Sequence, residues 1–352
     1  MRILQVVSRF DFGGAENYVR ELSNQLQKSN HQVFILSQNG RQQKLLETGI
    51  LFTTVPFLFK LVFLRALLYI YYVKKFQIET IHAHQRLPIL AASLAGWITG
   101  VPVVATVHGR VRYDLRSWFS RKIPSRFIFV SRQVLNISQY KKQLERRSIV
   151  IPNGINIEHS HCQPEPFHLG YICRLDSKHI AMVKMLMEIM PLMNQKYQHV
   201  KLSIIGEGKD LKLVHTWAES INRQAGRCMV MVHGYLNHAD QQVIPIDLVV
   251  GVGRVAIGAA MAGCAVVSAN NNRMGELITS ANYDFYLHNN FVNINGHKPT
   301  TESLYRVIDH YCQNRNQLHP DVERVSTNVN NDCHWSRIAD QVLTVYRQAS
   351  KP

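Results

Sequence analysis

The sequence predicts an α/β protein made of two Rossmann-like domains. Three observations lead to this prediction: short apolar strands alternate with helical segments, the alternation stops at residues 159–169, and it then resumes. Uninterrupted apolar strands that alternate with helices are typical of a parallel sheet covered on both faces. With 352 residues, the chain is also long enough for roughly two domains, each with a core of its own.

The first domain is expected over residues 1–160. Helical spacing is clear after its first strand, where Val19, Leu22 and Leu26 fall on one helix face. The predicted strands lie in the segments RILQVVS, HQVFILS, IETIHAH, VPVVATVHG, RFIFVS and SIVIPNG.

The second domain is expected over residues 165–330, after the proline-containing segment HSHCQPEPFHL. Its strands lie in LGYICRL, VKLSIIGEG and CMVMVHGY, with helices in MVKMLMEIMPLMNQKY and LKLVHTWAESINRQ. The stretch DLVVGVGRVAIGAAMAGCAVV adds a buried strand, a glycine-bounded loop, a helix of small residues and another strand. The amphipathic tail helix, residues 335–350, is expected to pack back on the first domain.

The chain is strongly basic, with 40 Lys and Arg against 24 Asp and Glu and a formal net charge of +16. Such an excess favours anionic partners. No zinc spacing, RNP-like motif or alternation of basic and aromatic residues occurs, so we expect a membrane surface or phosphorylated ligands and no nucleic acid. Six scattered cysteines, and a start that is a strand instead of a leader peptide, predict a cytoplasmic protein with reduced thiols.

Residues 57–76, FLFKLVFLRALLYIYYVKKF, combine apolar and aromatic residues with Lys60, Arg65, Lys74 and Lys75. The charges interrupt the segment too often for a transmembrane helix, which needs about 20 mainly apolar residues. An interfacial helix on an anionic bilayer fits this composition. An ordinary buried helix between two strands is the alternative.

Two glycines, Gly13 and Gly14, separate the first strand from the first helix. Glycine lets the backbone approach a ligand closely, and a helix N-terminus offers free N–H groups to an anion. The segment lacks the GxGxxG fingerprint and the ribose-binding acid of a dinucleotide site. A tight turn without a ligand is the equally simple interpretation.

His108 follows a buried strand, at the edge where open α/β sheets bind their ligands. It can hydrogen-bond a sugar hydroxyl or serve a purely structural purpose. His82 and His84 end a neighbouring strand and, two residues apart, share one face. No third ligand accompanies them, so no metal is expected.

Arg174, Asp176 and Lys178 follow the strand that opens the second domain. Arg is a planar fork and Lys a point charge, and at a strand exit the two side chains can clamp a diphosphate. A solvated basic loop is the alternative.

In order, the segments GGAENYVREL, HAH, TVHG, FVS, VIPNGIN, GYICRLDSK, LSIIGEG, VHGY, DLVVGVGR and AAMAGCAVVS resemble the retaining, family-4-like glycosyltransferases (glycosyl transferases group 1) of the GT-B fold. They span nearly the whole chain. The resemblance implies two domains that face a cleft, with His108 near the donor sugar and Arg174 and Lys178 on the departing diphosphate. The donor and nucleotide residues that it implies are Gly13, Gly14, Asn153, Gly206, Glu207, Gly234, Tyr235, Gly251, Gly253, Arg254, Gly258, Ala259 and Glu276.

Two departures from the family accompany the resemblance. Cys173 stands where the family has a glycine before the arginine, and both acids of the family's E-x7-E motif are absent, since those positions are Val250 and Gly258 here. The expected activity is transfer of a sugar, with retention and without a metal or other cofactor, from a nucleotide-diphospho-sugar, UDP favoured. The expected acceptor is a lipid-linked or membrane-associated glycan in bacterial lipopolysaccharide or capsule synthesis, at the inner face of the cytoplasmic membrane. A non-catalytic subunit of the same fold and a nucleotide-sugar epimerase are the alternatives.

Overall fold

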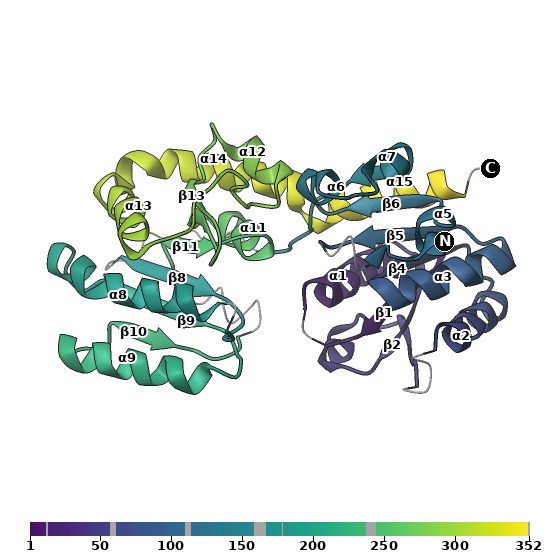
Figure 1. Ribbon diagram of the computed structural model, residues 1–352, viewed down its shortest axis with the longest axis horizontal. Helices are drawn as coiled ribbons and strands as arrows, with labels where there is room; N and C mark the ends of the chain where they lie inside the picture. The colour runs from purple at the N-terminus through teal and green to yellow at the C-terminus, as the bar shows by residue number, and fades with distance from the viewer. Residues whose placement is uncertain are drawn as a thin grey trace. The chain divides into compact units, whose positions relative to one another are not determined.

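The computed structural model describes residues 1–11, 13–56, 61–109, 114–157, 167–177, 179–236 and 244–350. The chain forms two compact units (Figure 1). Unit 1 consists of Met1–Ile155 and Asp332–Pro352, and unit 2 consists of Asn156–Asn331.

Unit 1 is built on a parallel sheet with the strand order β3-β2-β1-β4-β5-β6-β7. The order changes direction at β1, which lies between β2 and β4. The strands are β1 (Arg2–Arg9), β2 (Gln32–Gln38), β3 (Leu51–Thr54), β4 (Thr80–His84), β5 (Val103–Val107), β6 (Arg126–Phe129) and β7 (Ser148–Val150).

Helices cover both faces of this sheet, and the alternation of side chains along each strand decides which residues meet which helices. Leu4, Ile81 and Ala105 belong to a core shared with α2 and α3, whereas Ile3 and Val104 belong to a core shared with α1 and α15. The helices are α1 (Gly14–Lys28), α2 (Val62–Lys75), α3 (Arg86–Thr99), α5 (Trp118–Lys122), α6 (Arg132–Asn136), α7 (Lys141–Leu144) and α15 (Trp335–Ala349), with 3-10 turns η1 (Arg41–Leu45) and η3 (Glu145–Arg147).

Unit 2 has a second sheet, with the order β10-β9-β8-β11-β12-β13. All its neighbours are parallel except β12 and β13, which pair antiparallel. The strands are β8 (His168–Ile172), β9 (Lys201–Ile205), β10 (Val230–Val232), β11 (Leu248–Gly251), β12 (Ala265–Ala269) and β13 (Met274–Leu277).

A core of unit 2 lies between this sheet and the helices α8, α9 and α13. Methionines of α8 fill much of it, among them Met182, Met187, Met190 and Met193. The helices are α8 (Ile180–Lys196), α9 (Leu211–Ala225), α11 (Arg254–Met261), α12 (Tyr283–His288), α13 (Thr301–Gln313) and α14 (Arg315–Cys333).

The predicted fold class is confirmed, because both units are α/β with mostly parallel sheets. Every strand expected from an apolar run is present. Two strands were missed, β3 and the antiparallel β13, whose sequence MGEL contains no apolar run.

Candidate functional site

In unit 1, three elements meet at the carboxyl edge of the sheet, around Gln85. This residue follows β4 and adopts a positive φ of 67°. Its Oε1 accepts the Ser8 backbone N–H at 3.1 Å, and its Nε2 donates to Glu16 Oε1 at 2.6 Å. One carboxamide thus ties the end of β1 and the first turn of α1 to the end of β4.

The two predicted glycines lie at the start of α1, beside this edge of the sheet. Gly13 is the N-cap, and a Cβ there would lie 2.2 Å from Glu16 Oε2. Gly14 is exposed, and a Cβ there would meet no atom within 4 Å. Among the described residues, none fills the space beside Gly14, as a ligand at this helix start would require.

His108 lies directly after β5 and is half-buried at the same edge. Its Nε2 is 3.1 Å from His84 Nδ1, and Tyr18 packs edge-on against its ring at 5.0 Å between centroids. His84 in turn contacts the ring of His82 at 4.2 Å, as expected for two residues on one face of β4.

Burial controls the charge of these histidines. His82 and His84 are fully buried, which lowers the pKa of His82 to about 3 and holds the pKa of His84 well below its usual range. The neighbouring His108 lowers both pKa values further. Both rings are therefore neutral at pH 7, with one donor and one acceptor nitrogen each.

Asn153 is buried in the loop after β7. The adjacent Gly154 faces Trp335 so closely that a Cβ would lie 2.4 Å from its indole. The glycine of the IPNG motif thus serves the packing of α15 against this loop.

In unit 2, Arg174 is exposed in the loop that follows β8. Backbone contacts hold that loop: the Leu175 N–H donates to the Glu207 carbonyl at 2.9 Å. Gly206 has a φ of 146°, and a Cβ there would lie 1.8 Å from the carbonyl oxygen of Cys173. Only glycine permits the β9 exit to approach the arginine loop this closely.

Gly234 and Tyr235 continue the same edge after β10. The Gly234 carbonyl accepts the Gly206 N–H at 2.6 Å, and Gly234 has a φ of 66°. Tyr235 is 42% exposed. Lys178, the other half of the predicted clamp, lies outside the described residues.

The loop between β11 and α11 keeps the predicted glycine scaffold. Gly251 ends β11, and Gly253 caps α11 with a φ of 59° while its N–H donates to the Asn290 carbonyl at 2.9 Å. Arg254 is the first residue of α11 and is half-buried.

The two positions of the missing acids are interior. Val250 is fully buried in β11, between β8 and β12, and Gly258 is buried in α11 beside Ala259. Carboxylates at these two positions would require partners inside the core. Gly258 and Ala259 both pack within the unit, and their assignment to the donor site stays a prediction.

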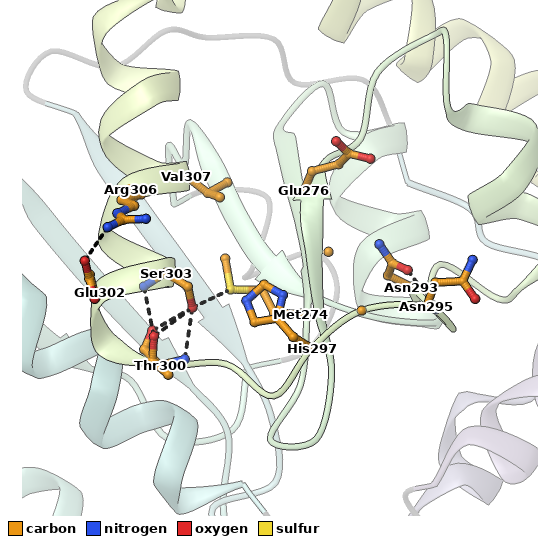
Figure 2. Close-up of a pocket in the computed structure, with 12 residues that line it drawn as sticks. Met274, Glu276, Asn293, Asn295, His297, Thr300, Glu302, Ser303, Arg306 and Val307 are labelled. Carbon is orange, nitrogen blue, oxygen red and sulfur yellow. Dashed lines mark hydrogen bonds and ion pairs between the residues drawn. The ribbon is translucent and has the colours of Figure 1, made fainter.

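Glu276 is exposed on β13 and lines a pocket of about 570 Å³ in unit 2 (Figure 2). The pocket lies between β13, the segment 293–297 and the first turns of α13. Its other polar lining residues are Asn293, Asn295, His297, Thr300, Glu302, Ser303 and Arg306. Glu302 and Arg306 pair with each other on α13, so part of the charge around this pocket is already compensated.

The basic residues assigned to a membrane surface separate into two groups. Arg65 is only 2% exposed and shares the inner face of α2 with Tyr69 and Val73, which corrects its assignment. Lys74 and Lys75 are exposed in the last turn of α2, and Lys60 lies outside the described residues. Among the described helices, none is long and apolar enough to cross a membrane.

The outer face of α2 is apolar. Phe63, Leu67 and Tyr71 recur every four residues and are 75%, 60% and 54% exposed. On the neighbouring α3, Trp97 is also largely exposed. Exposed apolar and aromatic side chains on the same helix as exposed lysines are typical of a helix that lies at a membrane–water interface.

Sequence reasoning missed three members of the unit 1 site: Gln5, Thr106 and Tyr346 hydrogen-bond the histidines of β4. Two of them could have been found, because a polar residue in the middle of an apolar strand needs a buried partner. Within the described residues, no group of three or more His, Cys, Asp or Glu side chains could hold a metal ion.

Two α/β units with mostly parallel sheets, each with glycine-rich loops and polar side chains at the carboxyl edge, have the architecture of the GT-B fold. The models for Glycosyltransferase Family 4 and for Glycosyl transferases group 1 match residues 12–159 and 166–293. The chain therefore belongs to the family-4, group-1 glycosyltransferases, which are retaining and metal-independent hexosyltransferases.

Solved structures share the fold along the whole chain. A glycosyltransferase from Rickettsia africae is 17% identical with a TM-score of 0.74, covering 99% of this chain and 98% of its own. Anabaena HepE in complex with UDP is 16% identical with a TM-score of 0.76, covering 99% and 100%. The lipopolysaccharide outer core galactosyltransferase WaaB is 15% identical with a TM-score of 0.56, covering 88% and 95%. The curated proteins contain no sequence match to the chain.

Proposed function

We propose that this nucleotide-sugar glycosyltransferase moves a sugar from a UDP-sugar to a lipid-linked or membrane-associated glycan of the bacterial surface. The proposed nucleotide-sugar donor rests on the loop of unit 2 that bears Arg174. Arg174 is exposed there. The loop that bears it is held by the backbone hydrogen bond from Leu175 to Glu207 and by the close approach of Gly206 to the Cys173 carbonyl.

Such a loop suits a departing diphosphate. The leaving group gains negative charge as the glycosidic bond breaks, and an arginine held beside it stabilises that charge without a metal. Lys178 would add a second positive charge, and the start of α11 at Gly253 would add backbone N–H groups. His108 would contact the donor sugar from the unit 1 edge, and Gly14 would leave room for the donor or the acceptor.

UDP is the favoured nucleotide, because HepE, which shares this fold, has been solved with UDP and with UDP-glucose. A surface polysaccharide is the favoured product class, because WaaB acts on the lipopolysaccharide outer core. The apolar outer face of α2 bears Phe63 and Leu67, and the exposed Lys74 and Lys75 end the same helix, which supports an acceptor held at an anionic membrane. We place the protein in the cytoplasm, at the inner face of the membrane, as the site of such an acceptor.

A thermal-shift titration with UDP, GDP, ADP and their sugar conjugates, without metal, tests the donor assignment. A ligand at about 100 times its dissociation constant adds roughly 2.7 kcal/mol to the free energy of unfolding. We expect a selective shift with UDP or a UDP-sugar. A shift with GDP or ADP alone would contradict the assignment of UDP.

His108→Ala tests the role of the histidine in the same protein. Turnover should fall by about two orders of magnitude. The dissociation constant for UDP should stay nearly unchanged, because the residue is assigned to the sugar and not to the nucleotide. Equal losses of turnover and UDP affinity would mean that His108 only supports the structure.

A further inference from the structure

A continuous chain of hydrogen bonds begins at Thr106 and leads through the interior of unit 1. The Thr106 hydroxyl lies 2.6 Å from His82 Nε2, and His82 Nδ1 lies 2.6 Å from the Tyr346 hydroxyl. That hydroxyl accepts the Gln5 Nε2–H at 3.2 Å. Tyr346 of α15 thus links His82 on β4 to Gln5 on β1, and His82 extends this connection to β5.

The chain of hydrogen bonds continues from Gln5 to His108 in the candidate site. Gln5 Oε1 lies 3.0 Å from His84 Nε2, and His84 Nδ1 lies 3.1 Å from His108 Nε2. The strand register explains these contacts. Gln5 pairs with His82 across β1 and β4, so that the side chain of His84 reaches it diagonally on the same face.

Every residue of this hydrogen-bond chain except His108 is shielded from water. Gln5, His82, His84, Thr106 and Tyr346 are all fully buried, whereas His108 is half-buried. Water cannot replace a missing partner inside this chain, so each donor must meet an acceptor within it. The neutral state of the two buried histidines gives each ring one donor and one acceptor nitrogen.

This requirement orients the protons. Gln5 Nε2 donates to Tyr346, which leaves Gln5 Oε1 to accept a proton from His84 Nε2. His84 Nδ1 is then bare and accepts, so the proton between the two rings belongs to His108 Nε2. The acceptor nitrogen of a neutral His108 is then its Nδ1.

We propose that His84 is a positioning residue for His108, and that the buried chain through Gln5, Tyr346 and His82 fixes His108 in the tautomer with its proton on Nε2. The consequence for activity rests on the proposed function of His108. A fixed tautomer keeps Nδ1 as the nitrogen that accepts a hydrogen bond, and the ring cannot offer a donor there unless it becomes charged.

Nitrogen-15 NMR of histidine-labelled, ligand-free protein tests this directly, with His108 assigned by its loss in His108→Ala. We expect a single Nε2–H tautomer for His108 in the unaltered protein. In His84→Phe the ring volume remains but both contacts disappear, so His108 should become a mixture of tautomers. Turnover should fall about tenfold at unchanged UDP affinity, since His108 loses its neutral hydrogen bond to His84.

His84→Asn supplies the conservative comparison. Its carboxamide oxygen can stand near the place of the imidazole Nδ1 and accept from His108, so it should restore the single tautomer and most of the turnover. His168→Phe is the matched control in unit 2, because His168 is also buried and hydrogen-bonded, to Ser203 at 2.8 Å. It should leave the His108 signals and turnover unchanged.

Tyr346→Phe keeps the test decisive if His84→Phe fails to fold. It removes one hydroxyl and with it the group that orients Gln5, so His108 should again show mixed tautomers. An unchanged single tautomer in a folded His84→Phe or Tyr346→Phe protein would overturn the proposal. Normal turnover in His108→Ala, with the tautomer effects intact, would instead refute only the proposed function of His108.

Discussion

Both units place candidate residues at the carboxyl edge of a parallel sheet, but they support them differently. In unit 1 the support is a set of buried polar side chains, from Tyr346 through Gln5 to His84. In unit 2 it is backbone, because Gly206 allows the β9 exit to touch the loop that carries Arg174. Side chains can control the position of a proton, whereas close backbone approach controls the shape of a loop.

The difference fits the two proposed tasks. A histidine near a reacting sugar must present a defined nitrogen, which only a hydrogen-bond partner can select. A diphosphate needs a positive charge at a fixed place, and arginine supplies that charge on a planar fork of donors. The two edges should therefore respond to different changes.

The largest effect is expected from Arg174→Ala, which removes the charge while leaving the backbone support intact. Turnover should fall about 10²–10³-fold, the usual cost of losing one preorganised group at a developing charge. UDP affinity should fall with it, measured by calorimetry and initial rates. Arg223→Ala, at an exposed arginine in the last turn of α9, is the control and should change neither quantity.

Gly206→Ala breaks the backbone support itself. The added Cβ would meet the Cys173 carbonyl, and the φ of 146° is strained for any other residue. We expect a loss of about 3 kcal/mol in the free energy of unfolding, measured with denaturant.

Gly226→Ala separates the clash from the backbone conformation. Gly226 also has a positive φ, of 64°, but a Cβ there would meet no atom within 4 Å. It should cost only about 1 kcal/mol. Equal losses in the two variants would show that close approach at Gly206 contributes nothing.

Acid should lower the stability of unit 1, because its buried histidines are neutral in the folded state. The folded pKa of His82 is about 3, below its ordinary value of 6.5, so the unfolded state takes up the proton first. Stability is then complete above about pH 6.5 and falls as the pH falls, by about 2 kcal/mol per buried neutral histidine at pH 5. His82 and His84 both contribute in this direction.

Urea unfolding at pH 7 and pH 5 measures this loss. His168 in unit 2, whose pKa burial lowers to about 4, adds to it. His82→Phe should flatten the pH dependence, although it also loses two hydrogen bonds at every pH. A stability that does not change between pH 7 and pH 5 would contradict the neutral, buried state of these rings.

The smallest effect concerns the outer face of unit 1. Lys74→Glu and Lys75→Glu should each weaken binding to vesicles with anionic lipids by about 1 kcal/mol or more, since each removes an attraction to the surface. Lys212→Glu, at an exposed lysine of α9 in unit 2, should have no such effect. Equal binding by all three variants in a flotation assay would remove α2 from the proposed membrane surface.

Prediction from sequence succeeded where the signal is local. Apolar runs located the strands, and glycine pairs located the tight turns at Gly13 and Gly253. It failed for Arg65, because a single charge on an apolar helix does not reveal which face is turned inward. The apolar run DLVV did place Val250 in a buried strand, as the structure has it.

The amino-acid sequence by itself determined the fold class, the order of the strands along the chain, the excess of positive charge and the presence of glycine-containing turns. These follow from hydrophobic periodicity and backbone sterics, which act over a few residues. The tertiary structure alone decided that Tyr346, 264 residues after His82, contacts it through its hydroxyl. Which polar groups share a buried face depends on the packing of distant segments, and that packing selects the nitrogen of His108 that bears its proton.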